Sequence, residues 1–112
     1  MSSTESLAAA YEAKAEAQAK LVAAQHSRII TRSSVKESLR AELTRNGEKV
    51  TESRLDDLAH VHSDYIEACA EESQATQQAI GAEGAVRVAE AEHAIARVAE
   101  AEHAIALAKR KS

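Results

Sequence analysis

The chain has 112 residues with no proline, three glycines and a net charge of −4, which predicts a single helical domain over residues 1–112. The one cysteine, Cys69, excludes a disulfide within the chain, and no segment reaches the roughly 20 apolar residues of a membrane span. The N-terminus lacks the basic region of a signal peptide, so a cytoplasmic protein is expected.

The first long helix is expected over residues 4–44. Alanine, the strongest helix former, is the commonest residue of the chain. Ser2 and Glu5 have the spacing of a capping box. Apolar residues then recur mostly at steps of three, four and seven, which indicates a helical seam. This seam consists of Leu7, Tyr11, Ala15, Ala19, Val22, Ile29, Val35, Leu39 and Leu43.

A turn over residues 45–51 and a short helix over 52–60 should follow. Arg45 supplies a cation at the helix end, and Gly47 tolerates the left-handed geometry that commonly ends a helix. Thr51 is a good N-cap for the short helix, which carries Leu55 and Leu58.

The second long helix is expected over residues 64–109, with Ser63 as its cap and an acid in its first turn. Gly81 and Gly84 are its weak points, and the sequence leaves open whether the helix breaks there. The expected fold is thus all-α. It is a helical hairpin of two long helices with a short helix at the bend, assembled as a coiled-coil-like oligomer.

Residues 87–96 and 97–106 are identical copies of RVAEAEHAIA. Ten residues turn a helix by about 1000°, so the copies lie roughly 80° out of phase. A seam still passes through both copies, although Glu102 interrupts it. Its large members should form an oligomer interface: Val88, Ile95, Val98 and Ile105. Because the Ala-rich hairpin buries little apolar area, self-association is its expected source of further stability.

Four cations recur every four residues on the first helix: Arg28, Arg32, Lys36 and Arg40. Neighbours at this spacing lie on one side of a helix and repel each other. An external anion would compensate that repulsion, so one interpretation is a stripe that contacts phosphates and extends to Arg45 and Lys49. The other is a solvated face neutralised by Glu37, Glu42 or the acidic last helix. The acidic net charge and the absence of stacking aromatics on the stripe oppose nucleic-acid binding.

Other polar patterns favour structural roles. Glu90 and His93, repeated as Glu100 and His103, have the spacing used in di-iron bundles, but both copies share one helix and intrahelical contacts explain them more simply. No order of Ser, His and Asp or of Cys and His suggests an enzyme, and no glycine-rich loop follows a strand. Neither catalysis nor a metal or cofactor is therefore expected.

Two stretches, YEAKAEAQAKL and RNGEKVTESRLDDLAHVHSDYIEA, resemble the UvsY-like family of phage recombination mediators over residues 11–70. The resemblance implies a homo-oligomer that binds single-stranded DNA and helps to load a recombinase onto strands coated by a single-strand-binding protein. It places DNA-contacting cations at Lys36, Arg40 and Arg45. A phage-encoded chain would act in the host cell cytoplasm.

Two functions are therefore carried forward. The first is a single-stranded-DNA-binding accessory protein of phage recombination or replication, which contacts phosphates through Arg32, Lys36, Arg40, Arg45 and Lys49. Its partners would be itself, single-stranded DNA, and a recombinase or single-strand-binding protein. The second is a structural or scaffolding coiled-coil protein, of the virion or of another assembly, with no role in nucleic-acid binding.

Overall fold

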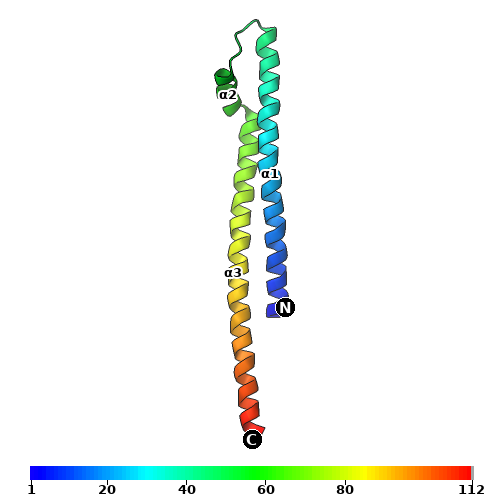
Figure 1. Ribbon diagram of the computed structural model, residues 1–112, viewed down its shortest axis with the longest axis vertical. Helices are drawn as coiled ribbons and strands as arrows, with labels where there is room; N and C mark the ends of the chain where they lie inside the picture. Colours follow the sequence, from blue (N-terminus) through cyan, green and yellow to red (C-terminus); the bar gives the residue numbers. More distant parts are fainter. Residues whose placement is uncertain (112) are drawn as a thin grey trace. The chain divides into compact units, whose positions relative to one another are not determined.

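The computed structural model describes residues 1–111, and these form three helices (Figure 1). α1 spans Ser3–Arg45, α2 spans Glu52–His60 and α3 spans Ser63–Lys111. No strand occurs among the described residues. The prediction of an all-α hairpin with two long helices and a short helix at the bend is confirmed. Within the same residues, no helix is both long and apolar enough to cross a membrane.

α1 is capped at both ends by the residues that the sequence indicates. At its start, the backbone N–H of Glu5 donates to Oγ of Ser2 over 3.1 Å. At its end, Gly47 has a φ of 71°, a left-handed conformation that glycine adopts readily because it has no Cβ. The N–H groups of Gly47 and of the next residue donate to the carbonyls of Thr44 and Leu43. These are the two hydrogen bonds of a Schellman motif.

The start of α2 agrees with the sequence analysis, whereas the start of α3 does not. Oγ1 of Thr51 accepts the backbone N–H of Arg54 over 3.2 Å and caps α2. Ser63, expected to cap α3, is instead its first helical residue. The cap is His62, whose Nδ1 accepts the backbone N–H of Asp64 over 3.1 Å. A ring nitrogen thus serves in place of the hydroxyl.

α3 continues without a break through Gly81 and Gly84. A Cβ added at either glycine would meet no other atom within 4 Å. Neither glycine is therefore needed for a close approach inside the chain. The question that the sequence left open is settled in favour of one uninterrupted helix.

The chain divides into two compact units. The bend unit comprises residues 18–78, and the end unit comprises residues 1–17 with the part of α3 that begins at Ala79. Both long helices contribute to each unit. Within each unit a segment of α1 packs against a segment of α3.

The core of the bend unit is formed where α2 meets the two long helices. Leu55 and Ala59 of α2 are completely buried. The other buried residues of this unit are Val35, Leu43, Ala68 and Ala75. A nine-residue helix is too short to be stable alone in water, so burial of Leu55 and Ala59 holds α2 in place.

The inner face of α3 is made mainly of alanine. Ala68, Ala75, Ala82, Ala89 and Ala96 recur every seven residues, and each is buried or half-buried. Seven-residue spacing is typical of a coiled-coil seam, and small side chains let two helix backbones approach closely. In the end unit this face contributes Ala89, beside Val86 of α3 and Ala17 of α1.

The seam predicted for α1 is only partly correct. Leu7, Val35, Leu39 and Leu43 lie on the inner face, but Tyr11, Ala15, Ala19, Val22 and Ile29 are exposed. The residues on the inner face in this part of α1 are Ala10, Ala17, Leu21 and Ala24. The predicted seam followed steps from Tyr11 through Ala15 and Ala19 to Val22, whereas the packing uses the alanines that recur every seven residues from Ala10.

Candidate functional site

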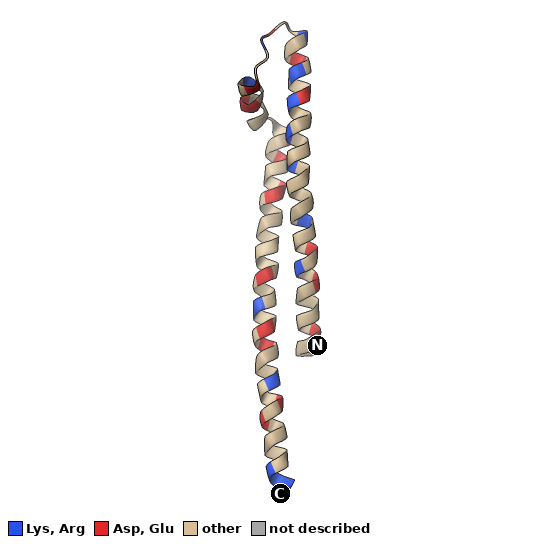
Figure 2. Cartoon of the chain, viewed as in Figure 1, with Lys and Arg blue, Asp and Glu red and all other residues tan. Residues whose placement is uncertain are grey.

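The basic stripe of α1, which comprises Arg28, Arg32, Lys36 and Arg40, faces acidic side chains. Figure 2 shows Lys and Arg of α1 beside the acidic residues of α2. All four cations of the stripe form ion pairs with carboxylates of α2 or α3. These contacts lie inside the bend unit. The chain therefore supplies the compensating anions itself.

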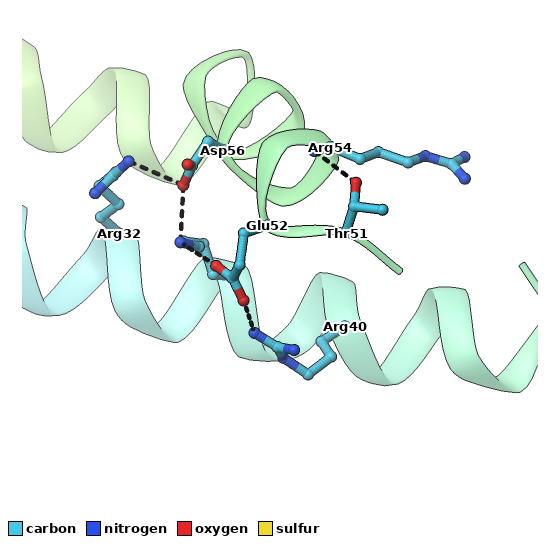
Figure 3. Close-up of polar contacts among 7 residues, drawn as sticks. Arg32, Arg40, Thr51, Glu52, Arg54 and Asp56 are labelled. Atoms are coloured by element: carbon cyan, nitrogen blue, oxygen red, sulfur yellow. Dashed lines mark hydrogen bonds and ion pairs between the residues drawn. The ribbon is translucent and has the colours of Figure 1, made fainter. Parts of the chain in front are cut away.

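Two carboxylates of α2 lie between three of the cations (Figure 3). Oδ1 of Asp56 is 3.0 Å from Nη2 of Arg32 and 2.7 Å from Nζ of Lys36. Glu52 accepts from Nζ of Lys36 over 3.0 Å and from Nη2 of Arg40 over 2.5 Å. Positive and negative groups thus alternate along this ion-pair ladder. The like-charge repulsion within the stripe is offset because each carboxylate is shared by two cations.

The hydrogen bonds of the ladder shift the pKa values of Glu52, Asp56 and Lys36. The hydrogen bond from Arg40, followed by that from Lys36, lowers the pKa of Glu52. The hydrogen bond from Lys36 lowers the pKa of Asp56, and the bonds to Asp56 and Glu52 raise the pKa of Lys36. All three shifts favour the charged forms. The contacts of the ladder therefore stabilise the charged forms of Lys36, Glu52 and Asp56.

Arg28 lies outside the ladder and pairs with α3. Its Nε donates to Oε2 of Glu72. This hydrogen bond is the largest cause of the raised pKa of Arg28, and a hydrogen bond with Tyr65 is the next. Arg32 has a different feature, because its Nε is buried without a hydrogen-bond partner while its Nη2 reaches Asp56. One donor of the stripe is therefore unsatisfied within the described chain.

Arg45 and Lys49, predicted to extend the stripe, lie around the turn between α1 and α2. Both are exposed, and within residues 1–111 neither forms an ion pair. Arg54 holds the turn by donating to Glu48 over 3.3 Å and to the backbone carbonyl of Lys49 over 3.4 Å. The five predicted phosphate contacts thus divide into three paired cations and two unpaired ones.

The predicted oligomer residues lie on a face of α3 that the chain itself does not cover. The relative exposure is 58% for Val88, 70% for Ile95, and 57% for both Val98 and Ile105. We call this surface the outer face. It comprises Gly81, Gly84, Val88, Ala91, Ile95, Val98, Glu102 and Ile105. Its steps of three and four residues place it on the side of α3 opposite the inner alanines.

The two copies of the repeat have different surroundings. In the first copy, Glu90 accepts the Tyr11 hydroxyl over 2.6 Å, and this bond raises the pKa of Tyr11. Nδ1 of His93 lies 3.2 Å from Oγ of Ser3. Intrahelical contacts were the sequence-based interpretation of this Glu and His, but α1 provides their partners. Every residue of the second copy, 97–106, is exposed.

The histidines near the bend also have structural roles. His60 stacks on Tyr65 with ring centroids 5.5 Å apart, and His62 caps α3. Among residues 1–111, no group of three or more His, Cys, Asp or Glu side chains is arranged to hold a metal ion.

Sequence reasoning did not assign roles to the two acids of α2. Glu52 and Asp56 are four residues apart, the same spacing as the cations that they contact. This matching periodicity was a signal that could have found the ladder. The sequence analysis instead named Glu37 and Glu42 or the last helix as sources of compensating charge.

Comparison of the chain with family models, curated proteins and solved structures finds no match.

Proposed function

We propose that the chain is a structural helical protein that acts by self-association through the outer face of α3. The observation that carries this proposal is the exposure of Val88, Ile95, Val98 and Ile105, each by more than half. An uncovered apolar surface in regular helical register is typical of a helix that packs against another helix. The physical role is therefore that of an assembly or scaffold component.

The small core within one chain supports the same proposal. Among the described residues, 1–111, nine hydrophobic residues are buried, of which five are alanines and two, Leu43 and Leu55, are leucines. Alanine contributes little apolar area, so a partner that covered the outer face would add substantially to the buried surface. Residues 97–111 are exposed on all sides of the helix, and packing against another copy would stabilise them too.

Sedimentation of a double variant, Val98→Gln with Ile105→Gln, tests this proposal. Burying each Val or Ile stabilises by about 1.5–3 kcal/mol, so losing two per chain should weaken association by more than about a hundredfold. Glutamine is a good helix former, and the helix content should be retained. The matched control is Val22→Gln with Ile29→Gln, two residues exposed to a similar degree on α1.

The control should associate like the wild type. A wild-type chain that sediments as a monomer up to millimolar concentration would contradict the proposal. Equal weakening in both double variants would show that association is not specific to the outer face.

A second candidate is binding of single-stranded DNA by a phage recombination or replication accessory protein. It is supported by the resemblance over residues 11–70 and by the exposure of the unpaired cations Arg45 and Lys49. The ladder opposes it, because Glu52 and Asp56 already occupy the cations that would meet phosphates. DNA would have to displace these carboxylates or bind around the turn.

Fluorescence anisotropy with labelled single-stranded DNA at about 50 and 200 mM salt tests this candidate. The informative variant is Arg45→Gln with Lys49→Gln, since neither residue belongs to the ladder. Each lost phosphate contact should reduce the slope of log affinity against log salt by about 0.7. The control, Lys20→Gln with Arg97→Gln, removes the same charge elsewhere. Absence of binding at low salt by the associated wild type would reject the candidate.

A further inference from the structure

α3 presents two apolar faces on opposite sides, and within residues 1–111 only the inner one is covered by other parts of the chain. The outer face carries its large side chains inside the two repeat copies, where Val88 and Ile95 belong to the first and Val98 and Ile105 to the second. The continuation of the inner face beyond Ala96 is not a comparable surface, because it carries the polar side chains of Glu100, His103 and Arg110. A partner is therefore expected on the outer face.

We propose that the partner is a second copy of this chain, and that the two α3 helices pair antiparallel about a twofold axis between Ala96 and Arg97. Val88 then packs against Ile105 of the partner subunit, and Ile95 packs against Val98 of the partner subunit. The first repeat copy of each chain lies along the second copy of the other. This inference rests on the proposed self-association and adds its orientation and register.

The symmetry of the repeat supports this register. Valine is the second residue of RVAEAEHAIA and isoleucine is the ninth, so the two are equally far from the ends of the copy. Reversing one copy against the other therefore places each valine opposite an isoleucine. All four large side chains of the outer face find large partners. The pairing is isologous, because both subunits use the same surface.

The charged residue on the outer face distinguishes antiparallel from parallel pairing. In a parallel pair in register, Glu102 would face the same carboxylate of its partner in the interface, where like charges are destabilising. In the proposed arrangement Glu102 is level with Ala91 of the partner subunit. A methyl group there leaves the carboxylate free to reach solvent.

The charge at the end of α3 favours the same orientation. The last helical residues include the cations Arg110 and Lys111. In the proposed arrangement the cations of the two chains lie at opposite ends of the paired helices. A parallel pair would instead gather the cations of both chains at one end, where they repel.

If the antiparallel register is shifted by seven residues in either direction, the four large residues no longer all pair with one another. A shift one way places Val98 opposite Glu102 of the partner subunit, and it places Val88 level with position 112, which is a serine. A shift the other way places Ile95 opposite Ala91 of the partner subunit and Glu102 opposite a glycine. Only the proposed register pairs each of the four large residues with another.

Disulfide trapping in a Cys69→Ser background tests the arrangement. Chains carrying Val88→Cys are mixed with chains carrying Ile105→Cys and exposed to a mild oxidant. Disulfides form only where Cα atoms come within about 7 Å. The 88–105 disulfide between chains should exceed the 88–88 disulfide by at least about tenfold, since the latter pair lies far apart in the proposed register.

Ile95→Cys mixed with Val98→Cys provides an independent pair, in case one substitution weakens the interface. Both mixtures are examined by sedimentation before oxidation. Associated protein that forms mainly 88–88 disulfides, or neither proposed disulfide, would overturn the antiparallel register while leaving self-association intact. Protein that is monomeric before oxidation, and whose wild type is also monomeric, would overturn both.

Discussion

At the scale of single residues, the end of α1 depends on one backbone conformation. Gly47 has a positive φ, and its N–H donates to the carbonyl of Thr44. Among the described residues, Gly47 alone has a positive φ. The chain reverses direction after α1 because this position accepts a left-handed conformation.

Replacing Gly47 with alanine should destabilise the chain by about 1–2 kcal/mol, the cost of the left-handed conformation for a residue with a Cβ. No atom lies within 4 Å of the added Cβ, so the loss would come from the backbone and not from a clash. The measurement is urea unfolding followed by circular dichroism. Gly81→Ala is the control and should stabilise α3 by up to about 1 kcal/mol, because that glycine is helical. A neutral Gly47→Ala variant would contradict this explanation.

The capping residues at the two ends of a helix were the most predictable from the sequence. Ser2, Gly47 and Thr51 act on backbone groups within a few positions of themselves, so a local pattern is sufficient to identify them. His62 was missed because sequence rules for capping favour a hydroxyl or a short carboxylate or amide, and Ser63 was adjacent. Which neighbour caps α3 depends on how the chain leaves α2.

At the scale of elements, α2 is bound to the hairpin by two different surfaces. Leu55 and Ala59 are buried against the long helices, while Glu52 and Asp56 bind the cations of α1. The four positions are spaced so that one side of this short helix is apolar and an adjacent side is acidic. We therefore expect the docking of α2 to depend on pH through Glu52 and Asp56.

We expect the bend unit to lose stability in acid because the pKa values of Glu52 and Asp56 are lowered in the folded chain. As the pH falls, the two carboxylates bind protons more readily in the unfolded chain than in the folded chain. The stabilisation that the ladder gives the folded chain is therefore complete above the ordinary carboxyl pKa of about 4. It is lost as the pH falls through the lowered folded values. Urea unfolding between neutral and acidic pH measures this dependence.

The variant Glu52→Gln with Asp56→Asn should show a flatter dependence of unfolding free energy on pH than the wild type. Glu37→Gln with Glu42→Gln is the matched control, because these exposed acids of α1 are not part of the ladder. A control variant that flattens the curve as much as the ladder variant would contradict the assignment.

The faces of the helices were harder to predict than their existence. The bounds of a helix follow from helix propensity and from the capping residues at its ends. The expected short helix, 52–60, agrees with α2. The inner face of α1 could not be predicted in the same way, because α1 has two apolar stripes. Larger residues such as Val22 and Ile29 lie on the stripe that is exposed. Likewise, the basic stripe was evident from spacing, but its partners depended on the docked position of α2.

At the scale of the whole molecule, the proposed self-association depends on the repeat, because the two copies have different surroundings. The first copy contacts α1 through Glu90 and His93, whereas the second copy has no α1 segment against it. Deleting residues 97–106 or residues 87–96 gives the same sequence, since the copies are identical. The shortened chain can keep the contacts to α1 while losing two of the four large residues on the outer face.

We therefore expect deletion of one copy to abolish self-association while leaving a folded hairpin. Sedimentation should show a monomer, and circular dichroism should show a helix content per residue close to that of the full chain. An assembly that persists after the deletion would place the interface elsewhere, and loss of helix throughout would show that folding requires association.

The hydrogen bonds between helices also suggest an order of folding. The partners are separated by 12 residues for Arg40 and Glu52, 44 for Arg28 and Glu72, and 90 for Ser3 and His93. Closing a loop costs more entropy as the loop lengthens, so the contacts nearest the turn are the least costly to form first. Each contact shortens the loop that the next must close. Folding of the hairpin should therefore proceed from the turn towards the ends, and local unfolding should begin at the ends. Amide protons near the start of α1 should then exchange with solvent before those beside α2.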